Sequence, residues 1–86
     1  MPYIAPESRA ILDSGADHPL VPGELNYVIT TIISKWLGPT PNYVEINAAI
    51  GVLECAKLEL YRRVAAPYED GKIAENGDVY DCAPNR

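Results

Sequence analysis

The chain has 86 residues, 12 of them acidic and 7 basic, with a formal net charge of -5. This length allows one small domain, residues 1–86. The hydrophobic core of so small a domain rarely contributes more than about 3–5 kcal/mol to the free energy of unfolding, so we expect a homo-oligomer. The acidic balance argues against binding to duplex nucleic acid, which needs clustered Lys and Arg. No apolar run approaches the length of a membrane span and no secretory leader opens the sequence, so we do not expect a membrane protein.

The first two expected helices cover about residues 6–13 and 23–37. Ser14 and Gly15 follow the first. The second has apolar residues at alternating intervals of three and one, which trace one face of a helix. These residues are Leu25, Val28, Ile29, Ile32, Ile33, Trp36 and Leu37. Gly38-Pro39 is a typical helix stop.

The third expected helix, about residues 42–66, begins at Asn42, a favourable N-cap residue. It carries one seam in heptad-like spacing: Ile46, Ile50, Leu53, Lys57, Leu60 and Val64. A second stripe consists of small or apolar residues: Ala48, Gly51, Val52, Cys55 and Ala56. A helix that is apolar nearly all round is buried on several sides. We therefore expect the surface of Ala48–Ala56 to bind a second copy of the chain; the alternative is that the N-terminal segment and the tail wrap it.

The tail, about residues 68–82, is expected to form a β-hairpin. Pro67 lacks a backbone N–H and should bend or end the preceding helix. Asn76-Gly77 is a strong hairpin-turn signal between two short strand-like segments. The predicted fold is therefore mainly α: two principal helices, a short N-terminal helix and a C-terminal hairpin.

The sequence offers little catalytic chemistry. The single histidine, His18, lies in a loop beside Asp17, and there is no nucleophile elbow to accompany it. No metal-ligand spacing and no Gly-rich phosphate loop occurs, so we expect neither a metal, nor a cofactor, nor an enzyme. Two cysteines are too few for a disulfide framework. Cys55 is expected to be a small apolar core residue, and Cys82 lies near the chain end.

Positive charge collects at the end of the third helix. The candidate ligand-binding residues there are Lys57, Tyr61, Arg62, Arg63 and Tyr68. Arginine forks bind phosphate or carboxylate groups, and tyrosine rings stack on bases, so these residues suit a nucleotide-like anion. Alternatively, the arginines pair with Glu59, Glu69 or Asp70 and only stabilise the helix.

Two sequence segments resemble small uncharacterised proteins encoded by bacteriophages and prophages. They are Pro22–Thr30 (PGELNYVIT) and Ile46–Tyr80, which contains YRRVAAPYED and ENGDVY. The resemblance implies a viral accessory protein in the host cytoplasm and carries no activity or site residue onto this chain. We expect either a non-enzymatic protein that sequesters a nucleotide-like host signal and so counters host defence, or a protein–protein interaction module, such as a virion component or an inhibitor of a host protein. The second hypothesis predicts an exposed apolar or Tyr-rich patch and arginines engaged by acidic residues.

Overall fold

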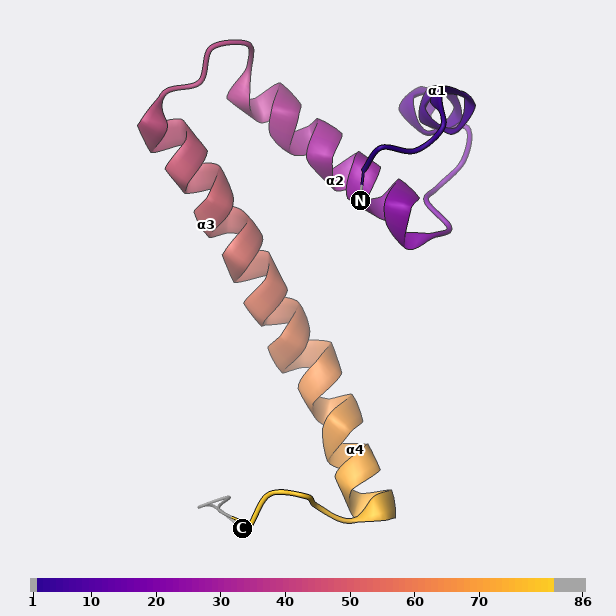
Figure 1. The fold of residues 1–86 in the computed structure, drawn as a ribbon, viewed down its shortest axis with the longest axis vertical. Coiled ribbons are helices and arrows are strands. Elements are labelled where there is room, and N and C mark those ends of the chain that lie inside the picture. The colour runs from indigo at the N-terminus through magenta and orange to yellow at the C-terminus, as the bar shows by residue number, and fades with distance from the viewer. Residues whose placement is uncertain (1, 82–86) are drawn as a thin grey trace. The chain divides into compact units, whose positions relative to one another are not determined.

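The computed structural model describes residues 2–81 and is mainly helical, which confirms the mainly α part of the predicted fold. The elements are α1 (Pro6–Ser14), α2 (Pro22–Leu37), α3 (Tyr43–Leu60), the π-helix η1 (Tyr61–Ala65) and α4 (Ala66–Asn76) (Figure 1). No strand occurs between residues 2 and 81. No helix in this part of the chain combines the length and apolar character needed to cross a bilayer. The chain divides into two compact units between Ala49 and Ile50.

Local signals in the sequence set the ends of the first two helices. α1 and α2 both begin with a proline, which suits the first helical turn because the N–H it lacks has no partner there. Glu24 Oε1 accepts a hydrogen bond of 2.9 Å from the Leu20 N–H. Gly15 ends α1 in a left-handed conformation with φ 76°, a region that glycine enters without a Cβ penalty.

A polar corner joins α1 to α2. The Tyr27 hydroxyl donates to both carboxylate oxygens of Asp13, at 2.9 and 2.8 Å. The Arg9 guanidinium lies 5.8 Å from the centre of the Tyr27 ring and donates through Nε to the Ile4 carbonyl at 2.9 Å. The hydrogen bond to Asp13 raises the pKa of Tyr27, because the neutral phenol is the donor.

The Tyr27–Asp13 hydrogen bond predicts how the stability of the fold depends on pH. A raised folded-state pKa means that the Tyr27–Asp13 bond stabilises the fold fully below the unfolded-state pKa of about 10 and is lost as pH rises through the folded-state value. We expect Tyr27→Phe to melt slightly below the wild type at neutral pH, with the difference vanishing in strong alkali. Differential scanning calorimetry across pH measures this, with Tyr43→Phe at an exposed tyrosine as the control. A difference that is independent of pH would contradict the assignment.

The start of α3 confirms the predicted cap. Asn42 Oδ1 accepts a hydrogen bond from the Glu45 N–H at 2.8 Å, and Glu45 Oε1 accepts one from the Asn42 N–H at 3.1 Å. This reciprocal pair satisfies two backbone donors that a bare helix end leaves open.

The helix continues through Pro67 instead of ending before it (Figure 1). In a regular α-helix the ring of Pro67 would clash with the carbonyl of Arg63, four residues earlier. The π turn immediately before Pro67 changes that spacing: the Ala66 N–H donates to the carbonyl of Tyr61, five residues back. The chain thus accommodates the proline by inserting one extra residue into a single turn.

The predicted C-terminal hairpin is wrong within the described residues. The segment Lys72–Asn76 belongs to α4, and Gly77 ends that helix with φ 91° and an N–H bond of 2.8 Å to the Ile73 carbonyl. Asn-Gly suits a helix C-terminus as well as a hairpin turn, because both need a positive φ. Ala74 and Glu75 favour helix over strand, which decides between the two. Residue 82 of the predicted tail and Cys82's role lie outside residues 2–81.

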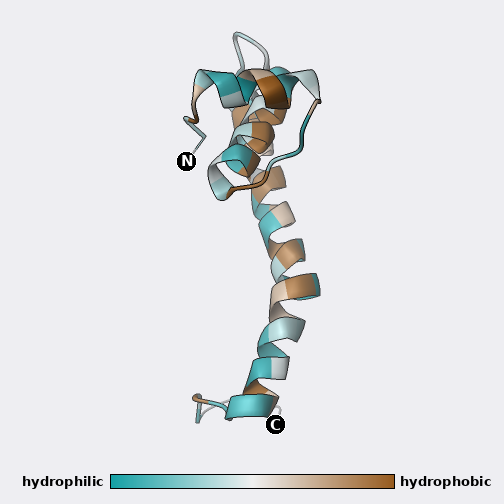
Figure 2. Ribbon diagram, turned by 90° about the vertical axis from the view of Figure 1, so that its right-hand side faces the viewer, coloured by the Kyte–Doolittle hydropathy of each residue, from teal (hydrophilic) through white to brown (hydrophobic). Residues whose placement is uncertain are grey.

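The helical surface of α3 and η1 is open to solvent. Among the described residues only Ala49 is buried, and every residue from Ile50 to Val64 is exposed. Apolar residues recur along α3, whereas α4 is more hydrophilic (Figure 2). The prediction that Cys55 is a core residue is wrong in this chain, since its thiol is unpaired and exposed.

Candidate functional site

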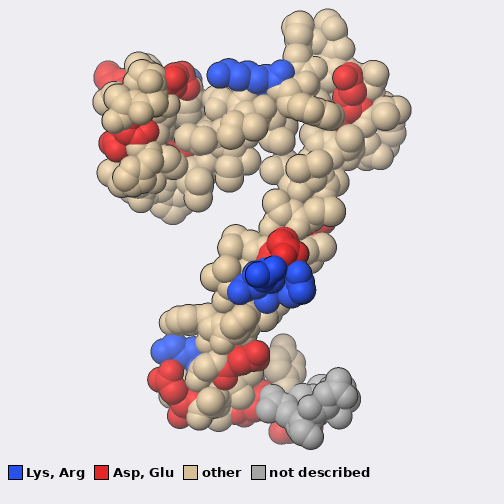
Figure 3. Space-filling view, turned by 180° about the vertical axis from the view of Figure 1, so that it is seen from behind, with Lys and Arg blue, Asp and Glu red and all other residues tan. Residues whose placement is uncertain are grey.

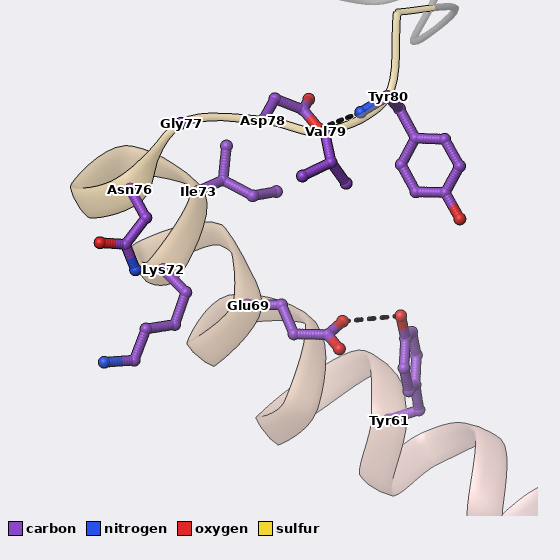
Figure 4. A pocket seen from close by; sticks show the side chains of 9 residues that line it. All are labelled: Tyr61, Glu69, Lys72, Ile73, Asn76, Gly77, Asp78, Val79 and Tyr80. Carbon is purple, nitrogen blue, oxygen red and sulfur yellow. Dashed lines mark hydrogen bonds between the residues drawn. The ribbon is translucent and has the colours of Figure 1, made fainter.

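The elements α3, η1 and α4 follow one another without a break and are called the long helix below. A hollow of about 450 Å³ lies between its last turns and the segment that follows α4 (Figure 4). It is lined by Tyr61, Glu69, Lys72, Ile73, Asn76, Gly77, Asp78, Val79 and Tyr80. All of these belong to the second compact unit. The hollow falls within the range of about 300–1,000 Å³ that small-molecule sites occupy.

The polar floor of the hollow is the pair Tyr61 and Glu69. The Tyr61 hydroxyl donates to Glu69 Oε1 at 2.8 Å across eight residues of helix. In a regular α-helix, residues i and i+7 share a face; the extra residue of η1 gives residue i+8 that place. The hydrogen bond to Glu69 raises the pKa of Tyr61, and the charge of the same carboxylate adds to that effect.

The other wall is the segment that follows α4. Gly77, with its positive φ, lets the chain turn back after the helix. Asp78 Oδ1 then accepts a hydrogen bond of 2.9 Å from the Tyr80 N–H, which holds a local turn. Val79 consequently lies beside Ile73, and the Tyr80 ring stands near Tyr61 (Figure 4).

The hollow is acidic on balance. Glu69 and Asp78 contribute two carboxylates to its lining, against one ammonium from Lys72. The Lys72 side chain points away from the two tyrosines (Figure 4). Its Nζ lies 3.9 Å from Glu75 Oε2 and 5.6 Å from the centre of the Tyr68 ring.

Of the five predicted ligand-binding residues, the lining of the hollow includes Tyr61 and not the others. Arg62 Nη2 lies 3.0 and 3.1 Å from the two carboxylate oxygens of Glu59, and Arg63 Nη1 lies 3.5 Å from Glu59 Oε1. Lys57 pairs with Glu54 at 3.1 Å. Basic and acidic side chains accordingly stand together on the middle of the long helix (Figure 3). Tyr68 instead faces Lys72.

Sequence reasoning missed Glu69, Ile73 and Tyr80 as lining residues. The predicted hairpin placed Ile73 and Tyr80 on paired strands, and the expected end of the helix at Pro67 left no place for the π turn that brings Glu69 to Tyr61. The proline after a Tyr-Arg-Arg run was the available clue, since a helix that passes through proline must change its local spacing.

Binding of a nucleotide-like anion through Arg62 and Arg63 stays a prediction. Both guanidinium groups are exposed and engaged by one carboxylate, so an anion would have to compete with Glu59. A thermal-shift series with cyclic and linear nucleotides at millimolar concentration tests it, with Arg62→Ala and Arg63→Ala as controls on any rise in melting temperature. The absence of any rise would reject it.

No three His, Cys, Asp or Glu side chains between residues 2 and 81 form a group that could hold a metal ion. A smaller hollow of about 150 Å³ adjoins the polar corner of α1 and α2.

The model of a family described as a domain of unknown function, DUF6899, matches residues 1–79. No curated protein and no solved structure matches the chain.

Proposed function

The chain belongs to the DUF6899 family of unknown function, and we propose that it is a non-enzymatic interaction module whose helical surface Ala48–Ala56 binds a second copy of the chain. The observation that carries the proposal is the exposure of every residue from Ile50 to Val64. Within its own unit this segment is part of a single helix, and a single helix cannot bury its own side chains.

The distribution of apolar residues around α3 supports a second copy over cover from within the chain. At about 100° per residue, Ile50 and Leu53 lie on one side of the helix, and Gly51 and Cys55 lie on the opposite side. One further helix covers only one of these sides. A side that one helix leaves uncovered needs a further partner, and an identical chain is present wherever the protein is present.

The energetic gain from this cover is substantial. The exposed fractions are 59% for Ile50, 60% for Val52 and 42% for Leu53. Full burial of such a side chain contributes about 1.5–3 kcal/mol relative to exposure. The charged groups nearby partly neutralise one another, because Lys57 pairs with Glu54 and both arginines pair with Glu59.

Light scattering after size-exclusion chromatography tests the proposal directly. We expect a mass of at least twice the 9.4 kDa of one chain at micromolar concentration, falling on dilution. A mass of one chain at all concentrations up to the millimolar range would overturn the proposal.

Two glycines on the long helix provide a matched pair. An added Cβ meets no atom within 4 Å at Gly51 or at Gly71. We expect Gly71→Ala to raise the free energy of unfolding by about 0.5–1 kcal/mol through helix propensity. The gain at Gly51 should be smaller or reversed, because its Cβ meets the second copy. Urea denaturation measures both, and equal gains would remove the Gly51 side from the interface.

The resemblance of the sequence motifs supports a finer proposal: a phage or prophage accessory protein that acts in the host cytoplasm and counters host defence by sequestering a nucleotide-like host signal. The alternative is a module that docks on a host protein or within the virion. Comparing plaque formation on bacteria with and without the expressed chain tests this role. Identical plaque counts across a panel of hosts with defined defence systems would reject it.

A further inference from the structure

The geometry of the hollow points to a second activity: we infer that it binds a guanidinium group on an apolar stem, the chemistry of an arginine side chain. The inference concerns the segment 61–80 alone and is independent of self-association through Ala48–Ala56. It also reverses the charge of the ligand expected from the neighbouring arginines.

The charge of the lining selects a cation. The Glu69 carboxylate stands in the floor of the hollow, whereas the Lys72 side chain, which lines its edge, points away from the two tyrosines toward Glu75 and the Tyr68 ring (Figure 4). Glu69 Oε1 already accepts the Tyr61 hydroxyl at 2.8 Å, which fixes the direction of the carboxylate. An ionised carboxylate accepts several hydrogen bonds, so it retains capacity for a donor from a ligand. An anion placed here would face both Glu69 and Asp78.

The aromatic rings select a planar cation. Tyr61 and Tyr80 approach from two different segments and stand on the same side of the hollow (Figure 4). A cation above a tyrosine ring is attracted by its π electrons. Guanidinium also stacks on such rings and matches a carboxylate with its fork of N–H donors, which ammonium does not do. Ile73 and Val79 supply the apolar surface that the stem of an arginine needs.

The raised pKa of Tyr61 agrees with this arrangement, because the phenol stays neutral through the physiological range and keeps donating to Glu69. Glu69 thereby stays oriented toward the Tyr61 hydroxyl (Figure 4).

The test is an NMR titration of the ¹⁵N-labelled full chain with N-acetyl-arginine amide, whose ends carry no charge. We expect saturable shifts confined to residues around Ile73, Val79 and Tyr80. The same amide of citrulline, which is nearly isosteric and uncharged, should give none. A short capped peptide with one arginine is compared with agmatine, the decarboxylated form of arginine, to separate the two sources of the group. Tighter binding of the peptide assigns the guanidinium to a polypeptide, and equal or tighter binding of agmatine assigns it to a small molecule.

Variants make the test residue-specific. We expect Glu69→Gln and Tyr80→Ala each to weaken binding by about fivefold. Tyr80 lies outside the helices, so Tyr80→Ala should leave the helical fold intact. This variant keeps the test decisive even when Glu69→Gln disturbs the helix. Asp70→Asn removes the adjacent carboxylate, which does not line the hollow although its charge reaches Tyr61, and should weaken binding much less than Glu69→Gln does. Equal shifts with the citrulline amide, no shifts with any probe at 50 mM, or equal weakening in Asp70→Asn would each overturn the inference.

Discussion

Replacing Leu53 by glutamate is expected to convert the proposed assembly to single chains. Leu53 lies on the heptad-like seam of α3 and is 42% exposed in one chain. This exposed part of the side chain is available for contact with a second copy. The substitution removes an apolar contact and places an unpaired carboxylate in the interface. Together these cost at least about 3 kcal/mol, or roughly a hundredfold in dissociation constant. Sedimentation equilibrium measures the change, and circular dichroism reports the helix that is lost with it.

The matched control is Asn47→Glu, which adds the same charge at a position of α3 that is already polar and lies outside Ala48–Ala56. Asn47 and Leu53 differ by about 120° around the helix at 100° per residue. We expect Asn47→Glu to keep the mass and melting temperature of the unchanged chain. If both variants dissociate the assembly, net charge and not the seam controls association; if neither does, α3 is not the interface.

The helical elements were predictable where several independent signals agree. For α2, the apolar stripe ending at Trp36 and the stop at Gly38-Pro39 specify one helix between fixed ends, and the structure has it at Pro22–Leu37. Asn42 was predictable as a cap because its side chain and that of Glu45 act over three residues. Such signals act within one or two turns, so they do not depend on the rest of the chain.

The end of the chain was not predictable because one local signal has two outcomes. Asn76-Gly77 requires a positive φ whether it closes a hairpin or ends a helix. The choice depends on residues before it, where Pro67 was expected to stop the helix and does not. The π turn depends on the balance between one proline and the whole helix around it, which sequence spacing does not encode.

The candidate site illustrates the same limit. Charge and residue type placed Tyr61, Arg62 and Arg63 together as an anion site, since they are adjacent in sequence. Neighbours on a helix point in different directions, about 100° apart. Arg62 and Arg63 therefore reach back to Glu59, and Tyr61 reaches forward to Glu69.

Replacing Pro67 by alanine is expected to remove the π turn. Alanine supplies the missing N–H and removes the ring that would clash with the Arg63 carbonyl in a regular α-helix. The segment 61–67 can therefore close as a regular α-helix. The helix should gain up to about 3 kcal/mol, the difference in propensity between the two residues. Every residue after the turn then rotates by about 100° relative to α3, which carries Glu69 away from Tyr61. The pKa of Tyr61 should fall back toward about 10, as ultraviolet titration of the phenol measures.

The control is Pro39→Ala, in the loop between α2 and α3, where no helical hydrogen bond depends on the residue. It should change neither the Tyr61 pKa nor the helical circular dichroism. An unchanged Tyr61 pKa in Pro67→Ala would mean that contacts other than the proline hold the π turn. If the pKa falls, binding of N-acetyl-arginine amide should be lost with it, because the same rotation moves Ile73 and Glu69 away from Tyr61. One substitution outside the lining then tests whether the proline builds the hollow.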